Sequence, residues 1–386
     1  MATTFRELLS TVKKGIREVS VDDVKKLVDA KTPMKLIDVR EGEEYSAGRL
    51  PGAISLPRGF LEIRIEEKAS REEPVILYCA GGTRSALAAK TLADMGYQNV
   101  ASMAGGYSRW HDAAYPTDKP FIMTPAQKER YRRHLTIPEV GEEGQAKLLK
   151  SKVLLMGAGG LGSPAALYLA AAGVGTLGII DMDVVDLSNL QRQILHSHER
   201  EGMAKTASAT EAIAALNPDV KVVPFQERLT SDNVSRILEG FDLVLDGGDN
   251  FPTRYLLNDA CVLHNKPNIH GSVYRFEGQV TTFVPRQGPC YRCLYPQPPP
   301  KDMAPSCAEA GVLGVLPGVI GLFQAIEALK LVAGFGQPLV GRLLTFDALG
   351  TTFNTLKLRR DPKCPVCSDG AKITFIDYEQ FCSTAA

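Results

Sequence analysis

The chain is predicted to be an α/β protein of two domains, and three features of the sequence carry this prediction. Its 386 residues suffice for two or three domains with separate cores. Strand-like runs alternate with helical segments over residues 15–115 and again over residues 125–386. The stretch HDAAYPTDKPFIMTP between them is proline-marked and aperiodic. We expect a domain at 15–115, a linker at 116–124 and a second domain at 125–386.

The first domain is expected to hold a small parallel sheet. Three short runs resemble strands: KLIDVR (35–40), AISLP (53–57) and VILYC (75–79). SALAAKTLADMG (85–96) has the pattern of an amphipathic helix that Gly96 closes.

The second domain is expected to be a doubly wound, Rossmann-like sheet. Four apolar runs are typical of buried parallel strands: KVLLMG (152–157), TLGIID (176–181), VKVVPF (220–225) and FDLVLDG (241–247). Helical segments such as SPAALYLAAAG (163–173) separate them, as in strand–helix–strand units.

Composition and charge disfavour some functions. The chain has 44 basic and 44 acidic side chains, so no net charge attracts nucleic acid or an acidic membrane. The first fifteen residues contain no apolar core, and we expect no secretory signal. The longest apolar stretch, residues 310–323, is shorter than a bilayer span and contains a proline. We expect a cytoplasmic protein without membrane or nucleic-acid partners.

The segment CAGGTRS (79–85) predicts a reactive cysteine. A turn from strand to helix directs backbone N–H groups into one cavity, and the helix dipole adds positive potential there. Arg84 adds a full charge, and Gly81 and Gly82 let the backbone fold close to the sulfur. We expect Cys79 to be held as an anion; the alternative is an inert buried cysteine before a helix.

This first domain resembles the rhodanese sulfurtransferases. LIDVREGEEYSAGRLPGAISLP (36–57) is similar to the family's entry strand and turn, and GGYSRW (105–110) to its closing motif. The resemblance implies a persulfide on Cys79 that is passed to an acceptor. We expect Asp38 and Arg40 to be structural.

The segment GAGGLG (157–162) predicts a nucleotide site. It lies between a strand and a helix, and Asp181 follows about 20 residues later at the end of the next strand. In this context we expect phosphate at the helix N-terminus and the carboxylate on the ribose. The predicted glycines are Gly157, Gly159, Gly160 and Gly162. This pattern alone does not separate NAD from ATP.

The polar residues that follow favour ATP. DLSNLQRQILH (186–196) and GMAKTAS (202–208) supply cations, and LVLDGGDN (243–250) ends on an acid and an amide. Attack on an α-phosphate, with pyrophosphate leaving, needs such cations and a carboxylate-held metal, whereas hydride transfer does not. An NAD-linked oxidoreductase is therefore disfavoured. The candidates are Ser188, Asn189, Arg192, Lys205, Asp249 and Asn250.

Residues 124–375 resemble the MoeB/ThiF adenylyltransferases, which activate ubiquitin-like sulfur carriers. RYRRHL (130–135), the glycine loop, SNLQRQ (188–193), the aspartate after DGG and two cysteine pairs occur in the family's order. The resemblance implies Arg133 on the triphosphate across a homodimer interface, Arg192 and Lys205 on the phosphates with Asn189 beside them, and Asp249 on magnesium. AMP would be joined to the terminal glycine of the carrier.

Two CxxC pairs predict a structural zinc site. CYRC (290–293) and CPVC (364–367) offer four thiolates, which fill a tetrahedral site and leave no open position. The four ligands are Cys290, Cys293, Cys364 and Cys367. A redox role for either pair is the weaker alternative.

Cys307 is a second candidate nucleophile, in the segment KDMAPSCAEAGVLG (301–314). It resembles the loop cysteine of the family that can form an acyl or persulfide link to the carrier. The alternative is a nonessential loop cysteine.

We therefore expect a fused enzyme in which adenylation of a carrier ending in Gly-Gly is followed by sulfur transfer from Cys79, giving a thiocarboxylate. An upstream donor such as a cysteine desulfurase would load Cys79. Alternatives are a first domain that only binds or regulates sulfur delivery, and a pure binding module. The motifs do not select among molybdopterin, thiamin, tRNA thiolation, cysteine and siderophore pathways.

Overall fold

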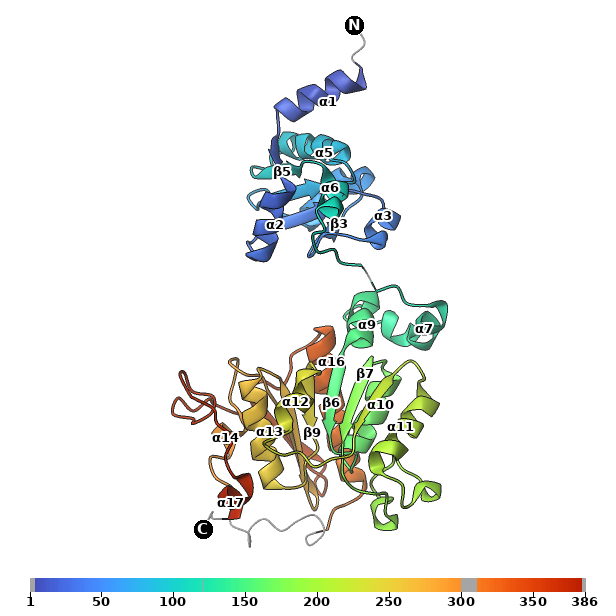
Figure 1. Cartoon of the computed structure of the whole chain (residues 1–386), viewed down its shortest axis with the longest axis vertical. Coiled ribbons are helices and arrows are strands. Elements are labelled where there is room, and N and C mark those ends of the chain that lie inside the picture. The colour runs from blue at the N-terminus through green and yellow to red at the C-terminus, as the bar shows by residue number, and fades with distance from the viewer. Residues whose placement is uncertain (1–3, 120, 300–310, 384–386) are drawn as a thin grey trace. The chain divides into compact units, whose positions relative to one another are not determined.

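The computed structural model describes residues 4–119, 121–299 and 311–383. The chain divides into two compact units, Met1–Ile122 and Met123–Ala386 (Figure 1). Each unit has its own sheet and its own hydrophobic core.

The first unit contains a parallel sheet whose described strands are ordered β1-β5-β4-β2-β3. Its elements are α1 (Phe5–Lys14), β1 (Arg17–Val19), α2 (Val21–Asp29), β2 (Lys35–Asp38), α3 (Gly42–Ala47), β3 (Ile54–Ser55), α4 (Leu61–Arg64), β4 (Val75–Tyr78), α5 (Thr83–Asp94), β5 (Val100–Met103) and α6 (Gly106–Asp112).

Strand β4 is apolar throughout because both faces of this sheet are covered. Val75 and Leu77 pack into a cluster with residues of α4 and α5. The alternate residues Ile76 and Tyr78 pack into a second cluster with α2 and with Trp110 of α6. The segment after β4 thus starts from a fixed, central strand.

Asp38 and Arg40 form a buried ion pair at the end of β2. Arg40 Nη2 lies 2.6 Å from Asp38 Oδ2 and also donates to the carbonyl oxygen of Gly48 at 2.6 Å. Asp38 is completely buried and Arg40 is 3% exposed. The pair connects the end of β2 to the end of α3.

The second unit is built on a mixed sheet whose described strands are ordered β13-β12-β11-β10-β9-β6-β7-β8. Its strands are β6 (Lys152–Met156), β7 (Thr176–Ile180), β8 (Lys221–Phe225), β9 (Leu243–Asp246), β10 (Asn268–Tyr274), β11 (Glu277–Phe283), β12 (Arg342–Asp347) and β13 (Thr352–Lys357). Its helices are α7 (Pro125–Arg130), α8 (Arg132–Leu135), α9 (Gly141–Lys150), α10 (Gly162–Ala171), α11 (Lys205–Leu216), α12 (Val234–Glu239), α13 (Phe251–Leu263), α14 (Tyr291–Leu294), α16 (Val315–Ala333) and α17 (Tyr378–Ser383).

The four predicted parallel strands lie in one part of this sheet, and antiparallel strands extend it beyond β10. β8, β7, β6, β9 and β10 run parallel, whereas β11, β12 and β13 follow as antiparallel neighbours. Residues 275–276 make the tight turn between β10 and β11, with Arg275 at φ +50°. The sequence analysis did not anticipate this extension.

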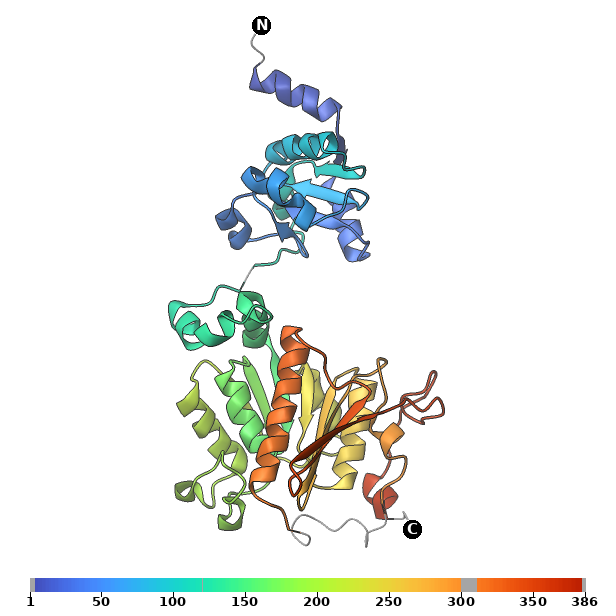
Figure 2. The ribbon, with the colours of Figure 1, turned by 180° about the vertical axis from the view of Figure 1, so that it is seen from behind.

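Two layers of helices cover the sheet. Val153 and Leu155 of β6 pack into a cluster with α9, α10, α11 and α16. Leu154, which points to the opposite face, packs with α12 and α13. Figure 1 shows α12 and α13 on one face, and Figure 2 shows α16 crossing the other. This is the doubly wound arrangement that the sequence predicts.

Helix α16 has the length and composition of a membrane span, with a mean hydropathy of 1.7. Its side chains Leu316, Ile320, Ala325 and Ala328 are nevertheless part of the core beneath the sheet. Burial against β10 and β11 accounts for its apolar character.

Candidate nucleotide, sulfur and zinc sites

A cavity of about 320 Å³ lies where β6, β7 and β9 end. Carboxyl ends of parallel strands are the usual place for a ligand in a doubly wound sheet. The predicted residues that line it are Gly157, Gly159, Gly160, Asp181, Arg192, Lys205, Asp249 and Asn250. Additional lining residues include Asp183, Gln193, Glu227, Arg228, Thr253 and Arg254.

The glycine loop is shaped by close backbone contacts. Gly157 has φ +95°, which favours glycine. A Cβ on Gly162 would lie 1.9 Å from the carbonyl oxygen of Gly157, so only glycine fits where α10 begins. Gly162 is not among the described lining residues, and it serves the tight turn, whereas Gly159 and Gly160 face the cavity.

His196 is hydrogen-bonded to the backbone of the same glycine loop. Its Nε2 lies 3.0 Å from the carbonyl oxygen of Ala158, and its Nδ1 lies 2.8 Å from the hydroxyl of Ser208. Burial lowers the pKa of His196, which favours a neutral ring whose Nε2–H donates to Ala158. The sequence analysis did not assign His196 to the site because its partners are distant in sequence.

Asp181 is held at the end of β7 by backbone donors. The N–H of Ala158 donates to Oδ2 at 2.9 Å, and the N–H of Asp183 donates to Oδ1 at 2.9 Å. The carboxylate therefore joins the glycine loop to the segment after β7.

The two predicted cations that line the cavity, Lys205 and Arg192, each contact a neighbouring oxygen. Lys205 Nζ lies 2.9 Å from Asp183 Oδ2, and its side chain is 6% exposed. Arg192 donates from Nη1 to the carbonyl oxygen of Ser188 at 3.1 Å. A buried ammonium paired with one exposed carboxylate still supplies positive potential to the cavity. Asp183 was missed, although the pattern Asp-x-Asp after a buried strand offers a signal.

Asp249 and Asn250 enter the cavity at the start of α13. The side chain of Asn250 accepts from the N–H of Thr253 at 2.9 Å and donates to Asp249 Oδ1 at 3.1 Å. It is therefore the N-cap of α13. Arg254, one turn later, donates to the carbonyl oxygen of Gly248 through Nε at 3.1 Å and Nη2 at 2.9 Å.

Besides Gly162, three residues predicted for the nucleotide site are not among the described residues that line the cavity. Within the described chain, Ser188 and Asn189 do not line the cavity; Asp186 Oδ1 accepts from the Ser188 N–H at 2.8 Å, shaping the turn before Arg192. Arg133 is exposed on α8 and is likewise outside the lining of the cavity; its assignment to the site of a second subunit stays a prediction. Cys307 lies outside the described residues.

Cys79 follows β4 and is 1% exposed. The N–H of Gly82 donates to its Sγ at 3.2 Å, and the hydroxyl of Ser85 lies 3.6 Å from the same atom. A Cβ on Gly106 would lie 2.2 Å from the carbonyl oxygen of Cys79. The GGYSRW motif can therefore pack this close to the Cys79 backbone only with glycine at position 106. These donors can stabilise an anion on the sulfur.

Arg84 makes a two-pronged ion pair with Glu44. Nη1 lies 2.7 Å from Oε2 and Nη2 lies 2.8 Å from Oε1. Hydrogen bonding from Arg84 lowers the pKa of Glu44 to about 2, and the same pair, with Cys79 nearby, raises the pKa of Arg84. Arg84, which was expected to add a full charge near the sulfur, thus has a carboxylate partner from α3.

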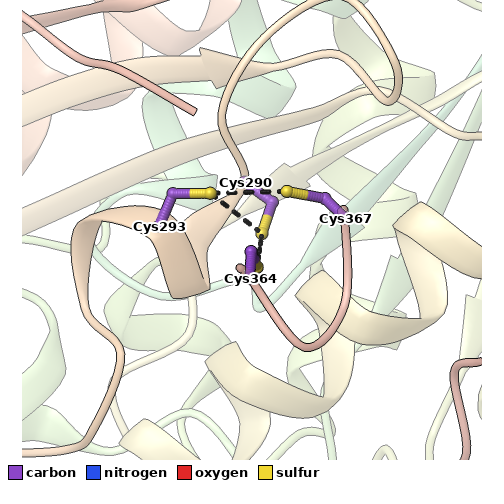
Figure 3. Close-up of side chains that lie close together, drawn as sticks. All are labelled: Cys290, Cys293, Cys364 and Cys367. Carbon is purple, nitrogen blue, oxygen red and sulfur yellow. Dashed lines mark hydrogen bonds between the residues drawn. The ribbon is translucent and has the colours of Figure 1, made fainter. Parts of the chain in front are cut away.

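The four predicted cysteines form one cluster (Figure 3). Their Sγ atoms lie within 4.8 Å of one another, with Cys290 to Cys364 at 3.6 Å and Cys293 to Cys367 at 3.3 Å. Sulfurs around a tetrahedral zinc at 2.3 Å would be about 3.8 Å apart. The cluster fits zinc and would fasten the segment after β13 to α14.

The fold and these sites define an adenylyltransferase domain joined to a sulfurtransferase domain. The chain belongs to the ThiF family, whose model matches residues 131–366, and a rhodanese-like domain matches residues 20–113.

Named relatives are similar over about two thirds of the chain. The SAMP-activating enzyme E1 of Haloferax volcanii is 52% identical over 259 residues, which cover 67% of this chain and 96% of that protein. The sulfur carrier protein adenylyltransferase of Thermus thermophilus is 51% identical, covering 67% and 98%. The probable adenylyltransferase/sulfurtransferase MoeZ of Mycobacterium tuberculosis is 48% identical, covering 70% of each chain.

A solved structure supports the fold. The complex of E. coli MccB with ATP aligns with a TM-score of 0.55 at 22% identity, covering 62% of this chain and 74% of that one.

Proposed function

We propose that this protein adenylates the C-terminal glycine of a small ubiquitin-like sulfur carrier that ends in Gly-Gly, and then transfers sulfur to it from Cys79. The names of the Thermus and Mycobacterium relatives, an adenylyltransferase of sulfur carrier proteins and a probable adenylyltransferase/sulfurtransferase, support both halves of the proposal. The product is a carrier with a C-terminal thiocarboxylate.

One observation carries the adenylation step: a glycine loop, two cations and a carboxylate converge on one cavity. The carrier's terminal carboxylate attacks the α-phosphorus of ATP, and pyrophosphate leaves. Lys205 and Arg192 offset the negative charge that gathers on the phosphates as this bond breaks. Backbone N–H groups near the N-terminus of α10 add to this stabilisation.

Magnesium fits the carboxylate of Asp249, which is exposed at the cavity. Carboxylate oxygens are ligands that magnesium prefers, together with substrate phosphates. When bound, the ion would neutralise phosphate charge. Asn250 orients Asp249 through the hydrogen bond to Oδ1.

Sulfur transfer uses the Cys79 loop. A persulfide on Cys79, loaded by a donor such as a cysteine desulfurase, attacks the acyl carbon through its outer sulfur and AMP leaves. A thiol reductant then attacks Cys79 Sγ, which releases the thiocarboxylate and leaves a disulfide between the reductant and Cys79. The N–H of Gly82 holds the sulfur in place for the first attack. An acyl link on Cys307 is an alternative acceptor for the persulfide.

The remaining parts of the proposal concern assembly and location. Arg133 would reach the triphosphate of a second copy in a homodimer. The protein would act in the cytoplasm, where thiols stay reduced.

The division of labour is tested with Cys79→Ala in the full-length chain. We expect this variant to keep carrier-dependent ATP–pyrophosphate exchange and to form no thiocarboxylate, detected by intact mass of the carrier. Cys382→Ala, at a half-buried cysteine on α17, is the matched control and should keep both activities. Loss of exchange in Cys79→Ala would refute the separation of the two steps.

A further inference from the structure

Behind the nucleotide cavity lies a buried pair of titratable side chains, Asp246 and His270. Asp246 is the last residue of β9, and His270 lies within β10. Their Cα atoms are direct partners across these two parallel strands. His270 Nδ1 lies 2.7 Å from Asp246 Oδ2. Asp246 is 1% exposed and His270 is completely buried.

The hydrogen bonds of this pair lead into the cavity loop. Asp246 Oδ1 accepts from the N–H of Gly248 at 3.0 Å. The carbonyl oxygen of Gly248 in turn accepts from Arg254. Gly247, Gly248, Asp249 and Arg254 all line the cavity. The chain of contacts therefore runs from His270 through Asp246 to the loop that carries Asp249.

The protonation states follow from the surroundings. His270 lies against the ring of Tyr291, with centroids 5.1 Å apart, and its Nε2 has no hydrogen-bond partner among the described residues. Burial lowers the pKa of His270, so the ring is neutral and its one N–H is on Nδ1. Burial alone would raise the pKa of Asp246, but the His270 hydrogen bond brings it below its ordinary value.

A buried carboxylate is costly, and an apolar pair would fill the same space at lower cost. The two side chains take no part in the backbone ladder of the sheet. Asp246 Oδ2 bonds His270, and Asp246 Oδ1 bonds the loop through the N–H of Gly248. Gln324 Nε2 separately fixes the backbone, donating to the carbonyl oxygens of Asp246 and Ile269 at 2.8 Å each. The side-chain pair thus acts on the loop and not on the strand ends.

We propose that His270 is a positioning residue for nucleotide binding: through Asp246 it fixes the loop at residues 247–249 that carries Asp249 into the cavity. This inference rests on the proposed function only in taking the ligand to be ATP. His270 does not contact the nucleotide in this account.

The test compares ATP affinity, measured by calorimetry with magnesium, in full-length His270→Leu and His270→Asn. Leucine removes the donor, and we expect about tenfold weaker binding, the usual effect of losing a hydrogen bond to a buried charge. Asparagine can place an N–H near the position of Nδ1 and should stay within about threefold of the natural protein. His264→Leu, at the end of α13 with its Nε2 2.9 Å from the Ser235 hydroxyl, is the control and should bind normally.

A pH series separates positioning from general destabilisation. Asp246 is faced by His270 from β10, Arg254 and Cys261 from α13 and Tyr291 from α14. Without His270, burial should raise the pKa of Asp246, and the carboxylate should become protonated at a higher pH. As the pH is lowered, ATP binding by His270→Leu should therefore be lost at a higher pH than ATP binding by the natural protein. Two results would overturn the proposal. One is that His270→Leu binds ATP as tightly as the natural protein at every pH. The other is that its affinity is lower by the same factor at every pH and that its melting temperature is lower as well.

Asp246→Asn provides a second variant in case His270→Leu does not fold. This variant lacks the titrating carboxylate, and we expect about tenfold weaker ATP binding. The pH dependence of its ATP affinity should no longer include the titration of residue 246. Unchanged affinity in Asp246→Asn would also overturn the proposal. Because ATP binding is measured without a carrier, absence of pyrophosphate exchange in the natural protein would refute the proposed function separately.

Discussion

Removing the Glu44 carboxylate should weaken the first unit by a measurable amount. The pKa of Glu44 falls from 4.5 to about 2, mainly through hydrogen bonds from Arg84. In a fully shielded site this shift would correspond to about 3 kcal/mol. Both side chains are 35% exposed, so solvent screening reduces the contribution, and we expect Glu44→Gln to cost about 1 kcal/mol at pH 7.

The contribution has a defined pH dependence. The folded pKa is depressed, so the stabilisation is complete above the ordinary value of 4.5 and is lost as the pH falls towards about 2. The difference between the natural protein and Glu44→Gln should therefore be constant near neutral pH and should vanish in strong acid.

The only tryptophan in the sequence provides the assay. Trp110 is completely buried in the first unit, so urea unfolding followed by its fluorescence reports on that unit. Glu62→Gln, which breaks the exposed 2.6 Å pair with Arg58, is the matched control and should cost less than about 0.5 kcal/mol. Equal midpoints for Glu44→Gln and the natural protein would refute the reasoning.

The same variant should also change the chemistry of Cys79. Without Glu44, the charge of Arg84 is no longer offset by a carboxylate, so the positive potential near the sulfur of Cys79 rises. An effect of about 1 kcal/mol would speed alkylation by iodoacetamide at neutral pH about fivefold. Slower alkylation would mean that Glu44 mainly holds Arg84 in position.

Two further changes address the second unit. Gly162→Ala should abolish ATP binding in calorimetry because the new Cβ would lie 1.9 Å from the Gly157 carbonyl oxygen. Gly318→Ala is the control and should bind ATP normally, because its Cβ would meet nothing within 4 Å among the described residues. Cys364→Ser should release the metal, detected as loss of zinc by elemental analysis together with a lower melting temperature; zinc content equal to that of the natural protein would contradict the four-thiolate assignment.

The fold and the cavity were predictable where the pattern is local. The glycine loop and Asp181 were found because one strand–turn–helix unit brings them together within 25 residues. The CxxC pairs were found because two such pairs have the ligand spacing that is typical of a zinc site. β6, β7 and β9 could be recognised from their buried apolar runs, whereas β8, which was predicted to be buried, is an edge strand without a buried residue.

Contacts between distant segments were not predictable. Glu44 and Arg84 are 40 residues apart, and nothing near either residue marks the other as its partner. Asp246 and His270 meet through the register in which β9 and β10 pair, and β10 was not among the strands predicted from the sequence. The antiparallel strands β12 and β13 were missed because β12 has a single buried residue and β13 is exposed throughout, so neither has the apolar run of a buried strand.

The central claim is that a terminal carboxylate meets ATP in the cavity between β6, β7 and β9. The most direct measurement is incorporation of radiolabelled pyrophosphate into ATP by the purified chain with magnesium and small proteins ending in Gly-Gly. We predict incorporation that requires such a partner and that Lys205→Ala strongly reduces. No incorporation with any such partner, together with tight binding of NAD, would contradict the account.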